Sequence, residues 1–337
     1  MTVTPAPLVF ALSESRALGE AVAREARLSL APLEDIAFPE GEFRLRPLTS
    51  VRDRTVFVVQ SLAGSADAPI AHRLLRLLFL LSALHDAEAE KTIALVPYLS
   101  FSRQDQRTQP RDAINTRYVA QLLESTGLNR FVALDAHNSA ALDNAYRIPV
   151  DHLSAIPMFV DHFASQGISA DLTVVSPDIG GVKRVQVFKE LLERRLGHGV
   201  ELAFVEKRRS AGAVSGGRII GQVNGRQAIV LDDLCASGET LLRAAAALRD
   251  AGARSIHVAC THTPMATGLE ALVASTAIAG IVITDSVGRD PGWQTPASRN
   301  SLCVLSIAPL FGQAVSRMAS GASLETLLSR WPPEPDL

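Results

Sequence analysis

The alternation of short apolar runs with helical patterns is the feature that most restricts what this chain can fold into. Runs rich in Val, Ile and Ala have the length of buried strands, and they cover residues 56–59, 93–96, 131–134, 173–175, 228–231, 257–260 and 281–283. Between several of them, apolar residues recur at helical spacing, over 70–84, 116–125, 182–192 and 241–251. Gly127 and Gly252 follow two of these helical patterns and indicate left-handed helix ends. We therefore predict an α/β fold with mainly parallel sheets that are flanked by helices.

Polar residues follow the expected strands in both halves of the chain, which indicates two similar domains. A chain of 337 residues is long enough for two domains that each bury a core. We place the joint at Ile148-Pro149-Val150, which gives one domain over residues 1–150 and a second over 151–330. The proline-rich residues 331–337 are expected to form a loosely ordered tail.

Composition and charge exclude several classes of protein. Hydrophobic residues make up 47% and charged residues 20%, which is typical of packed domains and not of disordered chains. The formal net charge of -2 gives no overall attraction to nucleic acid or acidic membranes, so local groups must bind any anion. The longest apolar stretch, 74–84, is interrupted by Arg76 and is much shorter than the roughly 20 residues of a membrane span. Scattered cysteines and the lack of a signal-peptide pattern favour a cytoplasmic protein.

The segment 228–240 carries the clearest chemical signal. An apolar run ends in Asp232 and Asp233, a loop of small residues follows, and a helical pattern then begins. The backbone N–H groups of such a loop and the helix N-terminus favour a phosphate, while the two carboxylates can accept sugar hydroxyls. This pattern predicts a site for a phosphorylated ribose, although an ordinary turn in which an acid caps the next helix has the same composition.

Four other segments carry groups that suit a phosphate-binding cleft. Asp178 stands between a strand and a helix and is a candidate magnesium ligand. The cations at 207–209 precede a stretch of Gly and Ser and suit a mobile flap that closes over phosphates. Arg103 lies in a polar loop with donors for phosphate, and His137 follows a strand. Each segment also fits a structural alternative: a capped turn, a solvated charge run, a polar loop or a structural histidine.

In this order and spacing, the motifs resemble those of the ribose-phosphate pyrophosphokinase family, also called phosphoribosyl pyrophosphate synthetases. The resemblance runs from about residue 8 to residue 328. Its most specific parts are FPEGE at 38–42, VPY at 96–98, SRQD at 102–105, DAH at 135–137, SPDIGG at 176–181, EKRR at 206–209 and the loop at 232–240. The resemblance implies two phosphoribosyltransferase-like domains, the first on the ATP side and the second carrying the sugar-phosphate loop and the flap.

The resemblance also implies an activity and a set of site residues. The enzyme would use Mg²⁺, transfer the β,γ-diphosphoryl group of ATP to the 1-hydroxyl of ribose 5-phosphate, release AMP, serve nucleotide biosynthesis, and form a homo-oligomer. Lys207 and Arg209 would be catalytic, and His137 and Asp178 would bind the metal. The implied ATP-binding residues are Phe38, Glu40, Glu42, Arg103 and Gln104. The implied ribose 5-phosphate-binding residues are Asp232, Asp233, Ala236, Ser237, Gly238, Glu239 and Thr240.

The chain departs from the family pattern at several of these positions. Glu40 stands where the family usually has Asp, and Ala236 and Glu239 interrupt a loop that normally reads DTGGT. Either the Glu239 carboxylate points outward and only its backbone N–H serves the phosphate, or sugar-phosphate binding is weakened. These changes leave one alternative, a non-catalytic homologue that binds nucleotide and regulates a partner. A second alternative is a phosphoribosyltransferase, because those enzymes also use a loop with paired Asp residues.

Overall fold

The computed structural model describes residues 5–65, 68–168, 171–210, 213–288 and 301–328, with only the backbone for 207–210, 213–216 and 301. The described residues form two compact units. The first comprises 5–154, 286–288 and 306–328, and the second comprises 155–285 and 301–305. The tail expected at 331–337 lies outside the described residues. Within the part that is described, no helix is long and apolar enough to cross a membrane.

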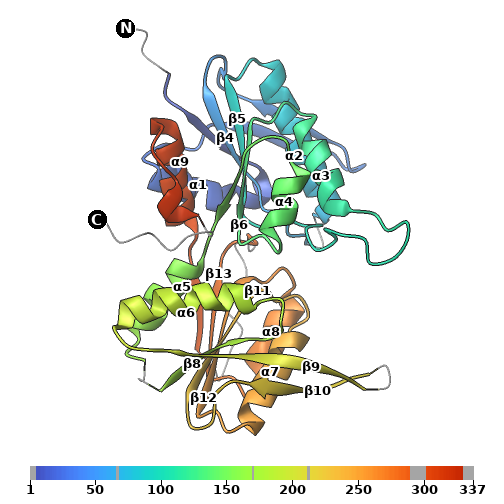
Figure 1. Ribbon diagram of the computed structural model, residues 1–337. Helices are drawn as coiled ribbons and strands as arrows, with labels where there is room; N and C mark the ends of the chain where they lie inside the picture. Colours follow the sequence, from blue (N-terminus) through green and yellow to red (C-terminus); the bar gives the residue numbers. More distant parts are fainter. Residues whose placement is uncertain (1–4, 66–67, 169–170, 211–212, 289–300, 329–337) are drawn as a thin grey trace. The chain divides into compact units, whose positions relative to one another are not determined.

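Within its described residues, the first unit has a five-stranded sheet in the order β1-β4-β5-β6-β7, with every neighbouring pair parallel. Figure 1 shows α1 and α9 on one face and α2, α3 and α4 on the other. A separate antiparallel hairpin, β2–β3, lies outside this sheet. The elements are β1 (Leu8–Ala11), η1 (Ser13–Ser15), α1 (Arg16–Glu25), β2 (Leu33–Ala37), β3 (Phe43–Pro47), β4 (Thr55–Val59), α2 (Ile70–Asp86), β5 (Lys91–Val96), α3 (Asn115–Glu124), β6 (Arg130–Leu134), α4 (Ser139–Ala145), β7 (Val150–Leu153), α9 (Ala308–Ser320) and η2 (Glu325–Leu327).

The second unit has a seven-stranded sheet across its described residues, in the order β10-β9-β8-β11-β12-β13-β14. Its pairs are parallel except β9 with β10, and helices again cover both faces, α5 and α6 on one and α7 and α8 on the other. The elements are α5 (Ile156–Ser165), β8 (Leu172–Ser176), α6 (Val182–Leu196), β9 (Glu201–Ser210), β10 (Ala213–Ile220), β11 (Gln227–Leu234), α7 (Glu239–Asp250), β12 (Ser255–His262), α8 (Ala266–Ala274), β13 (Gly280–Thr284) and β14 (Ser301–Leu305).

Burial explains why the apolar runs form these strands. In β4 every residue from Val56 to Val59 is fully buried, as expected for a parallel strand with helices on both faces. Val56 and Val58 belong to one core with Leu77 and Leu81 of α2. In the second unit the corresponding core joins alternate residues of β11 and β12 to apolar residues of α7 and α8. Each unit therefore holds its own sheet rigidly enough to position the loops at the strand ends.

The predicted α/β class with mainly parallel sheets is confirmed. Gly252 follows α7 with φ of 84°, and Gly127 follows α3 with φ of 79°, so both have the left-handed conformation expected at helix ends. β7 begins at Val150 and pairs with β6, so the strand that follows the expected joint belongs to the first unit, which continues to Ser154. The last long helix, α9, packs on α1 in the first unit.

Candidate functional site

The paired acids lie at the end of β11, as the sequence predicted, and the strand continues one residue beyond them to Leu234. The strand is longer because Asp232 and Leu234 still pair in register with Cys260 and His262 of β12. The side chain of Asp233 is buried, and that of Asp232 is mostly buried. Two carboxylates are thus held side by side at the carboxyl end of a central strand.

A cation from α6 lies against both carboxylates. Nη1 of Arg184 is 2.9 Å from Oδ1 of Asp233 and 3.6 Å from Oδ1 of Asp232. The Asp233 backbone N–H also donates to Oδ1 of Asp232 at 2.9 Å. Burial, with the charge of Asp233, raises the pKa of Asp232, and Arg184 acts in the opposite direction. Sequence reasoning did not single out Arg184; its place in the first turn after the Asp178 loop was the available signal.

The loop after the acids leads into the N-terminus of α7. Gly238 is the N-cap residue of α7 with φ of 82°, which favours glycine, and no side chain caps this end among the described residues. The backbone N–H groups at the N-terminus of α7 therefore suit an anion. The Glu239 side chain is 74% exposed and lies 4.0 Å from Arg243, one turn along the helix. The carboxylate points into solvent, which matches the first of the two arrangements considered for Glu239.

A glycine in α8 fixes the path of this loop. A Cβ atom on Gly268 would lie 1.9 Å from the carbonyl oxygen of Ala236, and one on Gly238 would lie 2.9 Å from the carbonyl oxygen of Gly268. The two backbones can approach this closely only because neither glycine has a side chain. Sequence reasoning did not single out Gly268, because it lies in the first turn of α8, about thirty residues after the loop.

Asp178 lies on the loop that joins β8 to α6. In the sheet, β8 is the neighbour of β11, which carries the acid pair. Asp178 Oδ1 accepts the Gly181 N–H at 3.3 Å, and Ser176 Oγ donates to the Asp178 carbonyl oxygen at 2.5 Å. This side-chain bond closes the turn from which α6 begins at Val182, as predicted. The structure therefore holds the Asp178 backbone in a fixed turn at the same sheet edge as Asp232.

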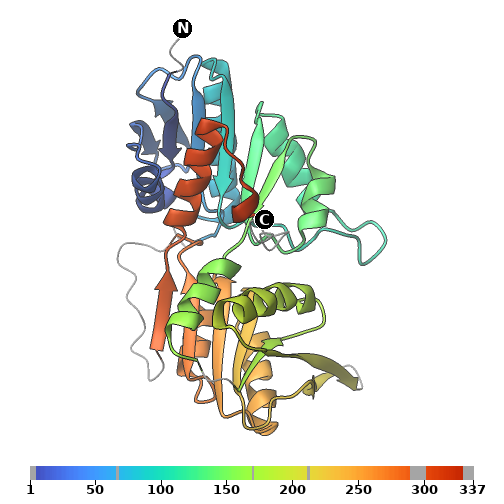
Figure 2. The ribbon, with the colours of Figure 1, turned by 60° about the vertical axis from the view of Figure 1, so that its left-hand side comes forward.

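The predicted flap corresponds to the hairpin formed by β9 and β10. Phe204 of β9 pairs with Ser176, the last residue of β8, so residues 205–210 extend past the end of that strand. Figures 1 and 2 show this hairpin projecting from the second unit. The backbones of Lys207 and Arg209 lie in the projecting part, opposite Gly217 and Val214 of β10, whereas their side chains are outside the described residues. Among the described residues of the Gly- and Ser-rich stretch expected in the flap, Ser210 ends β9 and residues 213–217 belong to β10.

The residues expected near ATP lie in the first unit. Phe38, Glu40 and Glu42 belong to the turn between β2 and β3, where all three are exposed. The Phe38 N–H donates to the Glu42 carbonyl oxygen at 2.8 Å, and the Gly41 N–H donates to the Phe38 carbonyl oxygen at 3.0 Å. Gly41 has φ of 95°, a conformation that the tight turn requires and glycine adopts without strain.

The loop after β5 and the loop after β6 are joined by a side chain that sequence reasoning did not single out. Arg103 and Gln104 are exposed on the first loop, and His137 is exposed on the second. Asn138 Nδ2 donates to Asp105 Oδ2 at 2.6 Å, while Asn138 Oδ1 accepts the Ala141 N–H and caps α4. Asn138 therefore ties the polar loop to the His137 loop at the carboxyl edge of the first sheet. Within the described residues, no three His, Cys, Asp or Glu side chains gather as a metal site.

Comparisons with known proteins cover nearly the whole chain. A family model for the N-terminal domain of ribose phosphate pyrophosphokinase matches residues 8–127, and one for a phosphoribosyl synthetase-associated domain matches residues 213–329. The ribose-phosphate pyrophosphokinase of Granulibacter bethesdensis is 36% identical over 322 residues, which cover 95% of this chain and 99% of that protein. Ribose-phosphate pyrophosphokinase 1 of Streptococcus pneumoniae is 32% identical over 325 residues, which cover 95% and 96%.

This chain belongs to the ribose-phosphate pyrophosphokinase family. The crystal structure of phosphoribosylpyrophosphate synthetase from Mycobacterium smegmatis has the same architecture, with a TM-score of 0.82 and 28% identity over 94% of this chain and 100% of that one. Membership in the ribose-phosphate pyrophosphokinase family identifies the chain as an enzyme, a diphosphotransferase. A regulatory homologue and a phosphoribosyltransferase are not favoured, because the similarity to pyrophosphokinases extends over both units.

Proposed function

We propose that this chain transfers the β,γ-diphosphoryl group of ATP to the 1-hydroxyl of ribose 5-phosphate, giving phosphoribosyl pyrophosphate and AMP. The hydroxyl oxygen would attack the β-phosphorus, the bond from that phosphorus to the oxygen bridging the α-phosphorus would break, and the hydroxyl proton would be lost. The main structural support is that β9, β8 and β11, which are neighbours, carry the flap, Asp178 and the acid pair to one sheet edge. Ligands of open parallel sheets bind beyond such edges.

The proposed ribose 5-phosphate site uses the loop after β11. The N–H groups of Ala236 to Thr240 would bind the phosphate, and Asp232 with Asp233 would accept the sugar hydroxyls. The exposed Glu239 side chain leaves its own backbone N–H available for this purpose. In phosphoryl transfer the protein chiefly positions the reactants and stabilises charge, which is the role we assign to Lys207 and Arg209. The proposed ATP-binding residues are Phe38, Glu40, Glu42, Arg103 and Gln104.

We propose Mg²⁺ as the cofactor, and we propose Asp178 of the second unit and His137 of the first unit as metal-binding residues. The carboxylate oxygens of Asp178 suit Mg²⁺, whereas the His137 ring nitrogen is a less usual donor for this ion. Because the described residues offer no three-ligand cluster, phosphate oxygens and water would complete the coordination. When bound, the ion would neutralise charge on the diphosphoryl group. The family resemblance further supports a cytoplasmic homo-oligomer.

Product analysis tests the proposed reaction. The purified protein with Mg²⁺, ATP and ribose 5-phosphate should form AMP and phosphoribosyl pyrophosphate in equal amounts. Lys207→Ala should slow turnover about a hundredfold or more, as expected for the loss of a positioned charge. Lys91→Ala is the matched control, because Lys91 is exposed at the amino end of β5, and it should leave turnover unchanged.

Three results would contradict the proposal in distinguishable ways. The absence of AMP above the Lys207→Ala background, across different metals and phosphate concentrations, would exclude diphosphoryl transfer. Nucleotide binding without turnover would indicate a regulatory homologue. Release of pyrophosphate that depends on an added nucleobase would indicate a phosphoribosyltransferase.

A further inference from the structure

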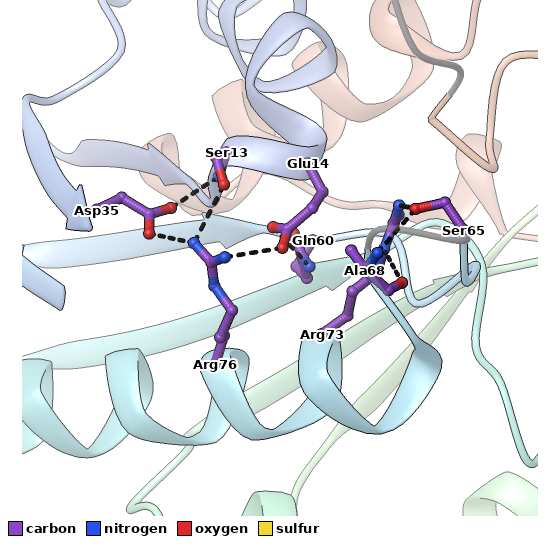
Figure 3. A network of polar contacts seen from close by, with 8 residues as sticks. All are labelled: Ser13, Glu14, Asp35, Gln60, Ser65, Ala68, Arg73 and Arg76. Carbon is purple, nitrogen blue, oxygen red and sulfur yellow. Dashed lines mark hydrogen bonds and ion pairs between the residues drawn. The ribbon is translucent and has the colours of Figure 1, made fainter. Parts of the chain in front are cut away.

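A buried charged cluster in the first unit has no part in the proposed chemistry. It consists of Ser13, Glu14, Asp35, Gln60 and Arg76, and Figure 3 shows Arg76 pointing from α2 toward the two acids. The side chains of Arg76, Glu14 and Asp35 are only 5%, 10% and 11% exposed. Burying charges is unfavourable unless they are paired, so the cluster needs a reason beyond simple packing.

Arg76 connects both acids through separate nitrogen atoms. Its Nη1 lies 3.0 Å from Oε1 of Glu14, and its Nη2 donates to Ser13 Oγ at 3.1 Å and pairs with Oδ1 of Asp35. The other oxygen of Asp35 accepts the Ser13 N–H at 3.0 Å. Gln60 Nε2 donates to Glu14 Oε2 at 3.5 Å. Asp35 is therefore held from two sides, by α2 and by the segment that follows β1.

The same guanidinium group also contacts the second strand of the hairpin. Its central carbon lies 5.6 Å from the centroid of the Phe43 ring, within the range of a cation–π contact. Two other α2 side chains, His72 and Phe79, contact that ring at centroid distances of 5.4 and 5.3 Å. Phe43 thus packs on three residues of α2. One of them, Arg76, contacts both strands of the hairpin, β2 through Asp35 and β3 through Phe43.

These contacts lie beside the turn to which we assign ATP binding. Asp35 in β2 is three residues before Phe38, and Phe43 in β3 directly follows Glu42. The hairpin forms a two-stranded sheet of its own, and isolated two-stranded hairpins are only marginally stable in water. Packing of Leu33 and Leu45 on the core supports the hairpin. Arg76 adds directional contacts to both strands close to the turn.

We propose that Arg76 is a positioning residue for nucleotide binding, which holds the β2–β3 hairpin so that the turn at 38–42 is already ordered when ATP arrives. The inference rests on the proposed function, because it assigns the turn to the nucleotide. Ordering a loop before binding increases affinity, since the conformational entropy is lost in folding and not in the complex. Arg76 itself need not touch ATP.

Two variants and one control test this role. Arg76→Met removes the charge and donors, and Asp35→Asn weakens the Arg76 contact while keeping the oxygen that accepts from Ser13. Each should raise the KM for ATP, by about tenfold for Arg76→Met, while the KM for ribose 5-phosphate changes less than about twofold. Arg76→Lys should recover part of the loss. Arg46→Met, which breaks an exposed ion pair with Glu34 on the same hairpin, should change neither KM.

Hydrogen exchange gives a second result that does not depend on activity. In Arg76→Met and Asp35→Asn the amides of Phe38 and Gly41, which are bonded within the turn, should exchange faster, while those of β4 and β5 are unchanged. Unchanged exchange in the turn, or an equal rise of both KM values, would overturn the positioning role. If the unmodified protein shows no turnover, the proposed function fails, and the exchange rates still decide whether Arg76 orders the hairpin.

Discussion

At the scale of single residues, Arg184 is a cation that contacts both carboxylates of the acid pair. Replacing it with Met leaves Asp232 and Asp233 mostly buried beside each other without the cation that contacts both. Removing one partner of a buried ion pair costs about 3–5 kcal/mol, and the partial exposure of Arg184 favours the lower end of that range. We expect Arg184→Met to lower the free energy of unfolding in urea by about 3 kcal/mol. We also expect it to raise the KM for ribose 5-phosphate more than that for ATP.

A control for this prediction is available on the same helix. Arg195 pairs with Asp161 at 3.3 Å, and both side chains are exposed. Arg195→Met should therefore change the free energy of unfolding by less than about 1 kcal/mol. If both substitutions had the same effect, the contact of Arg184 with the acids would not be what stabilises this region.

The raised pKa of Asp232 predicts how stability depends on pH. Burial and the neighbouring Asp233 shift this pKa above the ordinary 3.8, so the folded protein keeps a proton that the unfolded chain releases. The associated stability is complete below the ordinary pKa and is lost as pH rises toward the folded-state pKa. Without metal or substrate, the free energy of unfolding should fall between about pH 5 and pH 8, and Asp232→Asn should flatten this slope. An unchanged slope in Asp232→Asn would assign the effect to other groups.

At the scale of elements, the sequence predicted the strands and helices that continuous local patterns of apolar residues encode. Buried strands such as β4 and β6 are apolar after their first residue, and α2 carries a long apolar face. The β2–β3 hairpin was missed because its strands mix charged and apolar residues and are only partly buried. The loops of the site were found by their motifs. The residues that hold these loops in place were not predicted, because they act through contacts between segments that are distant in the sequence. Arg184, for example, contacts Asp233, which lies 49 positions later in the chain.

The packing of α8 on the loop after β11 gives the prediction at this scale. A methyl group at Gly268 would overlap the Ala236 carbonyl group, so Gly268→Ala must displace the loop, the helix or both. Because a misplacement of about 1 Å can cost a hundredfold in rate, we expect kcat/KM for ribose 5-phosphate to fall about a hundredfold. Gly199→Ala is the control, since a Cβ there would meet only Glu193, at 3.9 Å. Equal activity of the two variants would show that the loop tolerates the displacement.

At the scale of the whole molecule, the chain returns to its first unit after building the second. The described residues 286–288 and 306–328 belong with residues 5–154, and α9 packs there on α1. Phe311 and Val315 of α9 are fully buried, as is Val22 of α1. Local sequence patterns contain no signal for this return, because an amphipathic helix at the end of the chain fits either unit equally well. We placed the boundary after residue 150 from the order of the segments along the chain alone.

The contact between α9 and α1 should therefore determine the stability of the first unit. A Cβ on Gly312 would lie 2.3 Å from Cβ of Glu25, so Gly312→Val must push the two helices apart. Overpacking of this kind costs about 1–3 kcal/mol, and we expect a loss of that size in urea unfolding, together with faster hydrogen exchange in α1 and α9 but not in α7. Gln313→Val places the same side chain on the exposed face of α9 and should show neither effect beyond a small change. Equal stability of the two valine variants, or faster exchange in α7, would mean that α9 is not required to hold the first unit together.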